Sequence, residues 1–322
     1  MRMRAGFAMS PEAAEAVLTP SAMAAFGEVC DLRLPVLHSF ADDLSDVDVL
    51  VTGWDCPPLD AAVLDKAPGL RAIVHTAGSV RGHVTEECWK RGIEVSSAAV
   101  ANALPVAEYT VAMILLSGKR VLERARAYRA TRDPGARFPR DVGNFGRTVG
   151  VLSASMIGRR VIELLRPFDF QVLLYDPYVP AAEAAALGAE HVGLDELFAR
   201  SNVVTVHAPL LPATRGLVDR RLITLMRPDA VLINTARGAL IDQDALASSG
   251  VRAILDVTDP EVLPAGHPLW DCNNVLITPH LAGSQGSECA RLAEFAVSEL
   301  RSWIGGAGFA HAVQPGDLGR IA

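Results

Sequence analysis

Residues 148–176 read TVGVLSASMIGRRVIELLRPFDFQVLLYD, and their pattern is the strongest indication of the fold class. The apolar run at 149–152 predicts a buried strand, residues 156–165 predict a helix, and residues 171–175 predict a second strand that ends at Asp176. Parallel strands need a long crossover between them, and that crossover is usually a helix. The stretch therefore predicts one strand–helix–strand unit of a parallel sheet.

The same alternation continues toward the C-terminus. Further strands are expected at 203–206, 230–233, 253–257 and 275–277, with helical stretches such as 195–200 and 242–248 between them. Continuous apolar runs separated by helices indicate a parallel sheet covered by helices on both faces.

The N-terminal part indicates a smaller α/β unit of its own. Its shorter strands are expected at 47–52, 70–75 and 93–96. A long helix is expected from about Pro105, a favoured residue in a first helical turn, to about Arg129. Four other predictions concern the later segments: a loop at 131–147, a helix at 289–303, the return of that helix onto the first unit, and loose order at 305–322.

Composition limits the class of protein. The chain has 322 residues, which favours two domains over one core, and no uninterrupted apolar run reaches the roughly 18 residues of a membrane span. The N-terminus lacks the pattern of a secretory signal. The net charge of −7 argues against nucleic acid and anionic membranes as partners. Five scattered cysteines without a CxxC pair favour reduced thiols in a cytoplasm and argue against a zinc site.

A turn that could hold a dinucleotide follows the first strand of the opening stretch. Dinucleotide-binding folds carry GxGxxG there, whereas residues 153–158 read SASMIG and keep only Gly158. Asp176, 18 residues further on, would accept the adenosine ribose hydroxyls and repel a 2′-phosphate, which favours NAD over NADP. Ser155 adds a Cβ where the backbone would meet phosphate, although its hydroxyl could donate to a phosphate oxygen. The alternative is an ordinary strand–helix turn with a capping serine and a solvated aspartate.

Three chemically versatile residues each follow an expected strand: Arg237, Glu261 and His280. Ligands of open parallel sheets bind at the carboxyl ends of the strands. A fixed cation, a carboxylate and an imidazole at that edge would suit a small anionic hydroxy acid. The alternatives are a surface ion pair for Arg237, a solvated turn residue for Glu261 and a structural histidine at 280.

With these residues in place, the chain resembles the D-isomer-specific 2-hydroxyacid dehydrogenase family, which includes phosphoglycerate dehydrogenases and glyoxylate/hydroxypyruvate reductases. The resemblance extends from about residue 70 to about residue 301. The segments that carry it are VHAPL at 206–210 with Thr214, INTARG at 233–238, LDV at 255–257 with Glu261 and Pro264, and TPHLAG at 278–283. The chain departs from the family at the two missing loop glycines, at Met156 and at Val262, where proline is usual.

The resemblance implies a fold and a reaction. The fold is a Rossmann-type doubly wound parallel sheet domain at 102–281, which binds NAD. It is inserted into a smaller flavodoxin-like α/β substrate-binding domain formed by 1–101 and 282–322. The reaction is hydride transfer between NAD(H) and a small 2-oxo acid/D-2-hydroxy acid pair. The helix after Asn102 resembles the family's dimerising helix and implies a homodimer.

The resemblance also implies roles for the site residues. His280 would be the general acid/base, Glu261 would accept its other ring N–H, and Arg237 would bind the substrate carboxylate and polarise the keto oxygen. The backbone N–H groups of Gly78 and Ser79 would bind the same carboxylate. The residues implied at the cofactor are Ser155, Met156, Ile157, Gly158, Asp176, His207, Ala208, Pro209, Thr214, Thr235, Ala236, Arg237, Asp256, His280, Ala282 and Gly283. Of these, Asp256 would contact the nicotinamide amide, while His207 could equally be a core histidine.

Two other functions stay open. One is a catalytically weak or inactive relative that senses NAD or binds protein, which the eroded phosphate loop favours. The other is the same scaffold acting on formate or phosphite. Formate enzymes of the family carry glutamine where this chain has Glu261, which disfavours that option.

Overall fold

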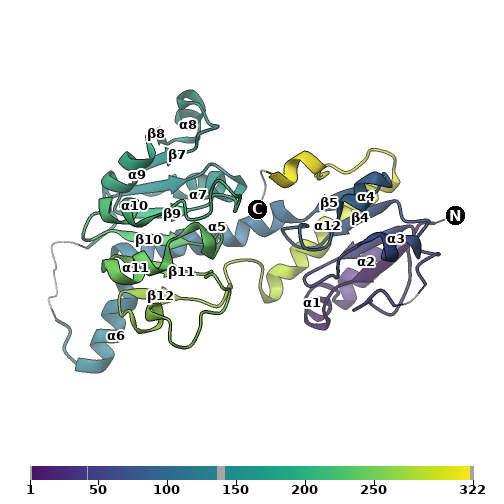
Figure 1. Cartoon of the computed structure of the whole chain (residues 1–322), viewed down its shortest axis with the longest axis horizontal. Helices are drawn as coiled ribbons and strands as arrows, with labels where there is room; N and C mark the ends of the chain where they lie inside the picture. Colours follow the sequence, from purple (N-terminus) through teal and green to yellow (C-terminus); the bar gives the residue numbers. More distant parts are fainter. Residues whose placement is uncertain (1, 42, 136–141, 320–322) are drawn as a thin grey trace. The chain divides into compact units, whose positions relative to one another are not determined.

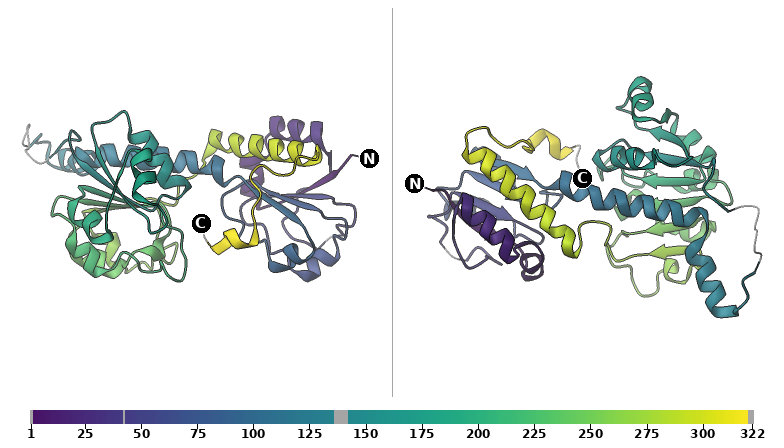
Figure 2. Two further views of the ribbon diagram at one scale, coloured as in Figure 1. Left: turned by 90° about the horizontal axis from the view of Figure 1, so that it is seen from above. Right: turned by 180° about the vertical axis from the view of Figure 1, so that it is seen from behind.

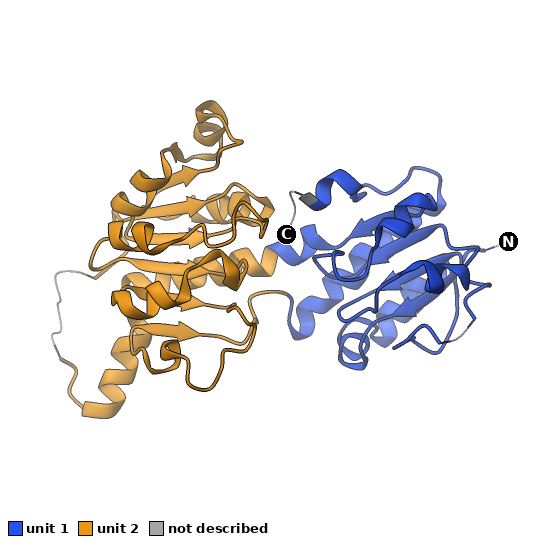
Figure 3. Cartoon of the chain, viewed as in Figure 1, with its two compact units in different colours: residues 1–103, 284–322 blue, residues 104–283 orange. Residues whose placement is uncertain are grey.

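The protein consists of two compact units (Figure 3), described here from a computed structural model of residues 2–41, 43–135 and 142–319. Unit 1 contains residues 1–103 and 284–322, and unit 2 contains residues 104–283. The expected domain boundaries, after residues 101 and 281, each lie two residues before those of the units.

Unit 2 is built on a seven-stranded parallel sheet (Figure 1). Its strands are β6 (Thr148–Leu152), β7 (Gln171–Tyr175), β8 (Glu190–His191), β9 (Val203–Val206), β10 (Val231–Asn234), β11 (Arg252–Leu255) and β12 (Val275–Ile277). Their order is β12-β11-β10-β9-β6-β7-β8, and all neighbours are parallel. Counted from β6 as the first strand, this is the Rossmann order 3-2-1-4-5-6 with one strand added. The predicted doubly wound sheet is confirmed, although the short edge strand β8 was not foreseen.

Helices cover both faces of this sheet, as Figure 2 shows. They are α7 (Met156–Leu165), α8 (Ala181–Leu187), α9 (Leu194–Arg200), α10 (Arg220–Leu225) and α11 (Gln243–Ser249), with 3-10 turns η1 (Gly238–Leu240) and η2 (Pro268–Asp271). Side chains alternate between the faces along each strand. Val151 packs in the cluster with α7 and α8, whereas Leu152 packs in the cluster with α9, α10 and α11. Each face therefore has its own hydrophobic core.

The long helix expected at 105–129 is two helices, α5 (Ala99–Gly118) and α6 (Val121–Thr131). The chain turns at Arg120, whose φ of 50° lies in the left-handed region and ends the regular hydrogen-bond pattern. Pro105 lies inside α5 rather than at its start, because the Ser97 hydroxyl already accepts the N–H of Ala99 at 3.2 Å. Part of the expected loop at 131–147 falls outside the described residues.

Among the described residues, α5 is long and apolar enough to span a membrane by length and composition alone. A helix in the core of a globular domain passes the same test. Three of its side chains, Ala107, Val111 and Ile114, are buried in the core of unit 2. This packing accounts for the apolar character of α5.

Unit 1 is a five-stranded parallel sheet with its own helices. The strands are β1 (Arg4–Ala8), β2 (Asp31–Leu32), β3 (Val49–Thr52), β4 (Ala72–His75) and β5 (Glu94–Ser97). The helices are α1 (Pro11–Val17), α2 (Pro20–Val29), α3 (Ala61–Asp65) and α4 (Glu86–Lys90). The strand order β2-β1-β3-β4-β5 is the flavodoxin-like order 2-1-3-4-5, which confirms the expected fold class.

The C-terminal part of the chain returns to unit 1 as predicted. After the 3-10 turn η3 (Gly286–Glu288), α12 (Cys289–Ile304) packs beside α1 and α2 (Figure 2). The expected loose order at 305–322 is wrong for the part that the structure describes. Val313 is buried, its N–H donates to Val95 at 2.7 Å, and a last 3-10 turn, η4 (Pro315–Gly319), follows.

Candidate active site

The turn after β6 keeps the shape of a phosphate-binding loop without two of its glycines. Ser153, at the first glycine position, has a φ of 80°, which glycine adopts easily and other residues rarely do. Gly158 is required, because an added Cβ would lie 2.1 Å from the carbonyl oxygen of Ser153. Ser153 therefore adopts a conformation suited to the first glycine of the pattern, and Gly158 allows the close packing that the third glycine provides.

The first turn of α7 contains the other three predicted loop residues. Ser155 is the helix N-cap, and its Oγ accepts the N–H of Gly158 at 3.3 Å. Met156 is 46% exposed and Ile157 packs partly against the core. The Ser155 hydroxyl serves as a helix cap and retains its own hydrogen for another acceptor.

Asp176 ends β7 and faces the turn after β6. Its Oδ2 accepts the N–H of Ala154 at 2.9 Å and the hydroxyl of Ser153 at 3.1 Å, and its Oδ1 accepts the N–H of Tyr178 at 2.9 Å. The residue is only 7% exposed. The alternative of a solvated aspartate is therefore wrong, because the carboxylate is an integral part of the loop.

A buried histidine lies at the point where the strand order reverses, between β6 and β9. His207 follows β9, and its Nε2 pairs with the Thr205 hydroxyl at 2.9 Å. Its Nδ1 is buried and has no hydrogen-bond partner among the described residues. Burial lowers the pKa of His207 to about 3, so the imidazole is neutral. An unpaired buried polar atom at this crevice is what a bound ligand would satisfy.

The segment after His207 is a compact turn. Ala208 is buried, and the Thr214 hydroxyl donates to the carbonyl of Pro209 at 2.5 Å while accepting the N–H of Leu211 at 2.8 Å. These two bonds close the turn on itself. The predicted residues Ala208, Pro209 and Thr214 therefore belong to one hydrogen-bonded turn after β9.

Arg237 follows β10 in a turn held by the strand's last residue. The Asn234 side chain donates to the Arg237 carbonyl at 2.9 Å and accepts the N–H of Ala236 at 3.0 Å. The Arg237 guanidinium donates to the Ala236 carbonyl at 2.6 Å, and the side chain is partly exposed. Thr235 is buried, and its hydroxyl pairs with that of Thr110 at 3.2 Å.

Gly238 joins this turn to the loop that carries Glu261. A Cβ at 238 would lie 2.0 Å from the carbonyl carbon of Thr258, so only glycine permits this backbone contact. The Thr258 hydroxyl lies 2.8 Å from the carbonyl of Glu261 and donates to it. Gly238 therefore positions the Glu261 loop beside the turn of Arg237.

Glu261 and His280 are in direct contact. His280 Nδ1 lies 2.6 Å from Glu261 Oε1, and the two side chains are 51% and 59% exposed. With the carboxylate as acceptor, the hydrogen stays on Nδ1 and Nε2 is left for another partner. The two residues are 19 positions apart in the chain, so the pair forms only in the folded unit.

Register places Arg237 near this pair. In the sheet, Asn234 of β10 is aligned with Leu255 of β11, which is aligned with Ile277 of β12. Arg237 comes three residues after Asn234, and His280 comes three residues after Ile277. The two strands are separated by β11, which puts their ends about 10 Å apart. The guanidinium and the imidazole therefore belong to the same edge of the same sheet.

Asp256 anchors the turn that carries His280. Its carboxylate accepts the N–H groups of Leu281 and Ala282, each at 2.9 Å, and the hydroxyl of Thr278 at 2.7 Å. Its backbone carbonyl accepts the N–H of His280 at 3.0 Å. The residue is 1% exposed. Asp256 thus has a positioning role that its predicted contact with nicotinamide did not anticipate.

The turn also departs from ordinary backbone geometry. His280 has a φ of 52°, in the left-handed region, and Gly283 closes unit 2 just beyond it. The Thr278 hydroxyl pairs with that of Tyr109 on α5 at 2.8 Å. Neither Tyr109 nor Ser153 was singled out from the sequence as a site residue. The serine at the first glycine position of the loop pattern was the only signal for the latter.

Gly78 and Ser79 belong to unit 1, where they follow β4. The Ser97 hydroxyl donates to the carbonyls of Ala77 and Gly78. Among the described residues, the N–H groups of Gly78 and Ser79 have no hydrogen-bond acceptor. Their predicted contact with a substrate carboxylate stays a prediction.

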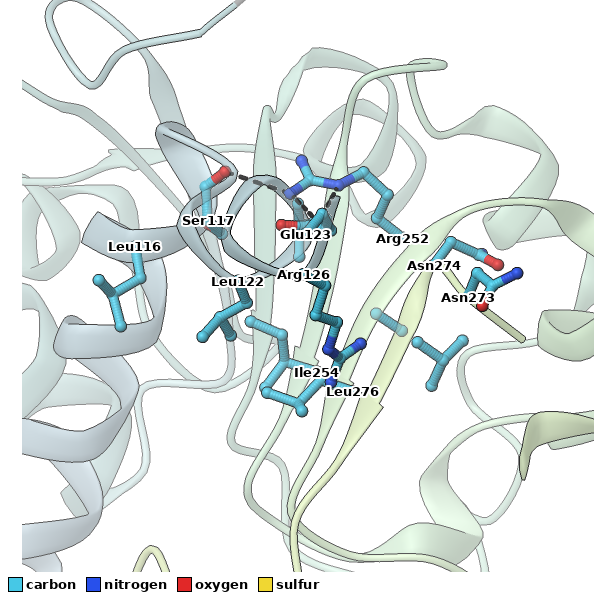
Figure 4. A pocket seen from close by; sticks show the side chains of 13 residues that line it. Leu116, Ser117, Leu122, Glu123, Arg126, Arg252, Ile254, Asn273, Asn274 and Leu276 are labelled. Atoms are coloured by element: carbon cyan, nitrogen blue, oxygen red, sulfur yellow. Dashed lines mark hydrogen bonds and ion pairs between the residues drawn. The ribbon is translucent and has the colours of Figure 1, made fainter. Parts of the chain in front are cut away.

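A separate pocket lies at the opposite edge of the unit 2 sheet, where β10, β11 and β12 begin (Figure 4). Arg252 forms an ion pair there with Glu123 of α6 and donates to the carbonyl of Ser117 at 3.3 Å. None of the predicted site residues lines this pocket. It is therefore distinct from the edge that holds His280.

The carboxyl edge of unit 2 fits a dinucleotide. It offers the N-terminus of α7 for the phosphates, the Asp176 carboxylate for a ribose and the unpaired Nδ1 of His207. An open parallel sheet binds such a ligand at this switch point. The fold and site together define a dinucleotide-binding oxidoreductase scaffold.

Comparison with known proteins identifies the family. Residues 111–282 match the family described as "D-isomer specific 2-hydroxyacid dehydrogenase, NAD binding domain". This chain belongs to that family, as the motifs in its sequence predict. Unit 2 is accordingly a domain that binds a nicotinamide dinucleotide.

Three similar proteins illustrate the relationship. A D-3-phosphoglycerate dehydrogenase of Mycobacterium leprae is 31% identical over 280 residues, which cover 83% of this chain and 52% of that protein. A glyoxylate reductase of Korarchaeum cryptofilum is 30% identical over 267 residues, 80% of each chain. The crystal structure of apo D-mandelate dehydrogenase from Rhodotorula graminis shares the fold, with a TM-score of 0.82, 21% identity and 98% coverage of each chain. The chain spans about half the length of the phosphoglycerate dehydrogenases that it matches.

Proposed function

We propose that this chain transfers a hydride between NAD(H) and a small 2-oxo acid/D-2-hydroxy acid pair. The observation that carries the proposal is the 2.6 Å contact between His280 Nδ1 and Glu261 Oε1 at the carboxyl edge of a dinucleotide-binding sheet. A histidine oriented by a carboxylate is a common arrangement for general acid–base catalysis.

His280 moves the proton. In reduction, the protonated imidazole donates its Nε2 hydrogen to the carbonyl oxygen of the substrate, while Glu261 accepts the Nδ1 hydrogen throughout and stabilises the imidazolium. In oxidation the same Nε2 takes the proton from the hydroxyl. The bound nicotinamide supplies or takes up the hydride.

Arg237 binds the carboxylate of the substrate and polarises the keto oxygen. A guanidinium can present two parallel N–H donors to a carboxylate, and its charge opposes that of the acid. The partly exposed Arg237 side chain suits contact with a ligand. The backbone N–H groups of Gly78 and Ser79 would contribute further donors to the same carboxylate.

We expect NAD rather than NADP as the cofactor. Asp176 carries a negative charge at the end of β7, and among the described residues no cation forms an ion pair with it. A 2′-phosphate would be repelled there, whereas ribose hydroxyls would be accepted. We extend the proposal to the remaining predicted cofactor residues, which follow β6, β9, β10, β11 and β12 along the chain.

Unit 1 would bind the substrate and unit 2 the cofactor, and we expect a homodimer. Support for the dimer comes from α6, which has no buried side chain, and from Tyr128, which is 57% exposed. Light scattering of the wild type and of Tyr128→Asp tests this: the variant should shift toward the monomer.

The five cysteines are free thiols, which suits a reducing compartment such as the cytoplasm.

A second candidate is an inactive relative that senses NAD or binds protein. The serines at positions 153 and 155, where the loop pattern has glycines, favour it. The Glu261–His280 pair opposes it, because a binding protein has no need of an oriented acid/base.

A substrate panel tests the proposal. Glyoxylate, hydroxypyruvate, pyruvate, and branched and aromatic 2-oxo acids, together with 3-phosphoglycerate for the reverse direction, would be offered with NADH or NAD and followed by absorbance. We expect turnover of at least one acid. Binding of NADH without turnover of any acid would favour a relative that senses NAD. No binding at millimolar NADH would contradict the proposed function and favour a relative that only binds protein.

A further inference from the structure

We infer that Ser153 competes with the cofactor ribose for the carboxylate of Asp176 and thereby sets the affinity of this chain for NAD(H). The inference rests on the proposed NAD(H) site. It concerns a residue whose position in the loop pattern normally holds a glycine, which has no side chain to compete.

The competition follows from counting acceptor positions on one carboxylate. A carboxylate has two oxygens and about four lone-pair positions. Ser153 and Ala154 occupy both positions of Oδ2, at 3.1 and 2.9 Å, and Tyr178 occupies one of Oδ1 at 2.9 Å. One position is left, and it belongs to Oδ1.

A ribose diol that donates two hydrogen bonds to Asp176 needs two acceptor positions on the carboxylate. Each of its two hydroxyls carries one O–H donor, and the diol would engage the carboxylate through both, the 2′-hydroxyl being the usual partner of an acidic residue at this position. Two of the three present donors are backbone N–H groups, which cannot leave without moving the loop. The Ser153 hydroxyl is the donor that can rotate away, so NAD(H) binding has to displace it.

The backbone explains why the serine makes this contact. At a φ of 80° a residue with a Cβ is strained, and the hydrogen bond from its hydroxyl to Asp176 offsets part of that strain. Asp176 is 7% exposed, so water does not readily replace this donor. The Ser153–Asp176 bond thus stabilises the loop without ligand and weakens the ligated state.

The pairing makes stability and affinity move in opposite directions. Ser153→Ala keeps the strained backbone, loses the hydroxyl and frees one position on Asp176. We expect a lower melting temperature of the ligand-free protein and NADH binding about tenfold tighter, the effect of one hydrogen bond to a charged group. If Ser153 had a purely structural role, Ser153→Ala would lower both the melting temperature and the affinity for NADH.

NADPH separates competition from a general loosening of the loop. Its 2′-phosphate offers the carboxylate no second donor, so the freed position brings it no gain. We expect the NADPH dissociation constant of Ser153→Ala to stay within about twofold of the wild-type value, while that for NADH falls about tenfold. An equal gain for both nucleotides would mean that the loop merely relaxed.

Isothermal titration calorimetry of the full chain with NADH and with NADPH, paired with thermal unfolding of the ligand-free protein, tests the inference. Ser201→Ala is the matched control, because it also removes a hydroxyl that donates to a protein oxygen, the Leu197 carbonyl at 2.6 Å, away from Asp176. It should lower the melting temperature and leave both affinities unchanged. Should Ser153→Ala not fold, Ser153→Gly removes the same hydroxyl at a φ that glycine accepts, with the same expected gain for NADH.

The outcomes separate the inference from the proposed function. Unchanged or weaker NADH binding by the Ser153 variants, with a wild type that binds NADH, would overturn the inference and leave the proposed function intact. Binding of NADH by the Ser153 variants but not by the wild type would support the inference. No binding by any of them at millimolar concentration would overturn the proposed function, and the inference with it.

Discussion

Gly238→Ala should disable the site while leaving the fold largely intact. The added Cβ would lie 2.0 Å from the Thr258 carbonyl carbon, and Cβ atoms essentially never approach within 3.0 Å, so the backbone must move by at least 3.0 − 2.0 = 1.0 Å. We expect the displacement to fall on the loop that contains Thr258 and leads to Glu261. A misplacement of about 1 Å in a catalytic array costs about 100-fold in rate, and overpacking of this kind costs about 1–3 kcal/mol of stability.

The assay is kcat/KM for the best 2-oxo acid of the panel, measured with the melting temperature. Gly266→Ala is the matched control, because a Cβ there meets nothing within 4 Å and the backbone is not left-handed. We expect Gly266→Ala to behave as wild type. If Gly238→Ala kept full kcat/KM, the close contact of the two turns would not be what positions Glu261.

Three further predictions follow from other parts of unit 2. His280→Ala should reduce turnover about 100-fold or more, within the range of general acid–base catalysis, with NADH binding largely kept; near-normal turnover would remove its assigned role. Tyr109→Phe, which cuts the link to Thr278, should lower kcat by several-fold with little change in the dissociation constant for NADH, and an unchanged kcat would show that the link is only structural. Urea unfolding should show stability falling as the pH drops below 6.5, because burial lowers the folded-state pKa of His207 to about 3 and the unfolded chain therefore binds the proton first. Protonation of His207 in the unfolded chain lowers the free energy of unfolding by about 2 kcal/mol between pH 6.5 and 5. The free energy of unfolding of His207→Asn should therefore depend less steeply on pH than that of the wild type, and equal slopes would contradict this.

Six of the seven strands of unit 2 could be predicted because each has a continuous apolar run. The observed ends of these strands differ from the expected ends by two residues at most. The largest difference is at β11, which was expected to end at Val257 and ends at Leu255. Strands β1, β2 and β8 were not foreseen. Two of these, β2 and β8, contain two residues each, which is too short for a periodic signal.

The break between α5 and α6 shows a different limit. Residues 99–131 carry no proline near the break, and the one local signal, Gly118, is found inside helices as well as at their ends. The left-handed φ of Arg120 occurs beside a contact with a later loop, in which the N–H of Gly143 donates to the Gly118 carbonyl at 2.7 Å. Local sequence does not contain that long-range information.

At the site, residue types were predictable but their hydrogen bonds were not. The family motifs identified Glu261 and His280, and the structure brings them into contact. The same reasoning treated Asp176 as a free ribose acceptor, whereas the folded loop already occupies most of its acceptor positions. That occupancy depends on a backbone conformation at Ser153 that a pattern of missing glycines does not predict.

We expect His280, oriented by Glu261, to complete a hydride transfer at the carboxyl edge of unit 2. Isotope transfer from NADH deuterated at nicotinamide C4 to a 2-oxo acid, read by NMR of the product, measures this transfer. We predict a D-2-hydroxy acid with deuterium at C2, formed at least about 100-fold more slowly by His280→Ala. Bound NADH that transfers no deuterium to any acid of the panel would contradict the claim.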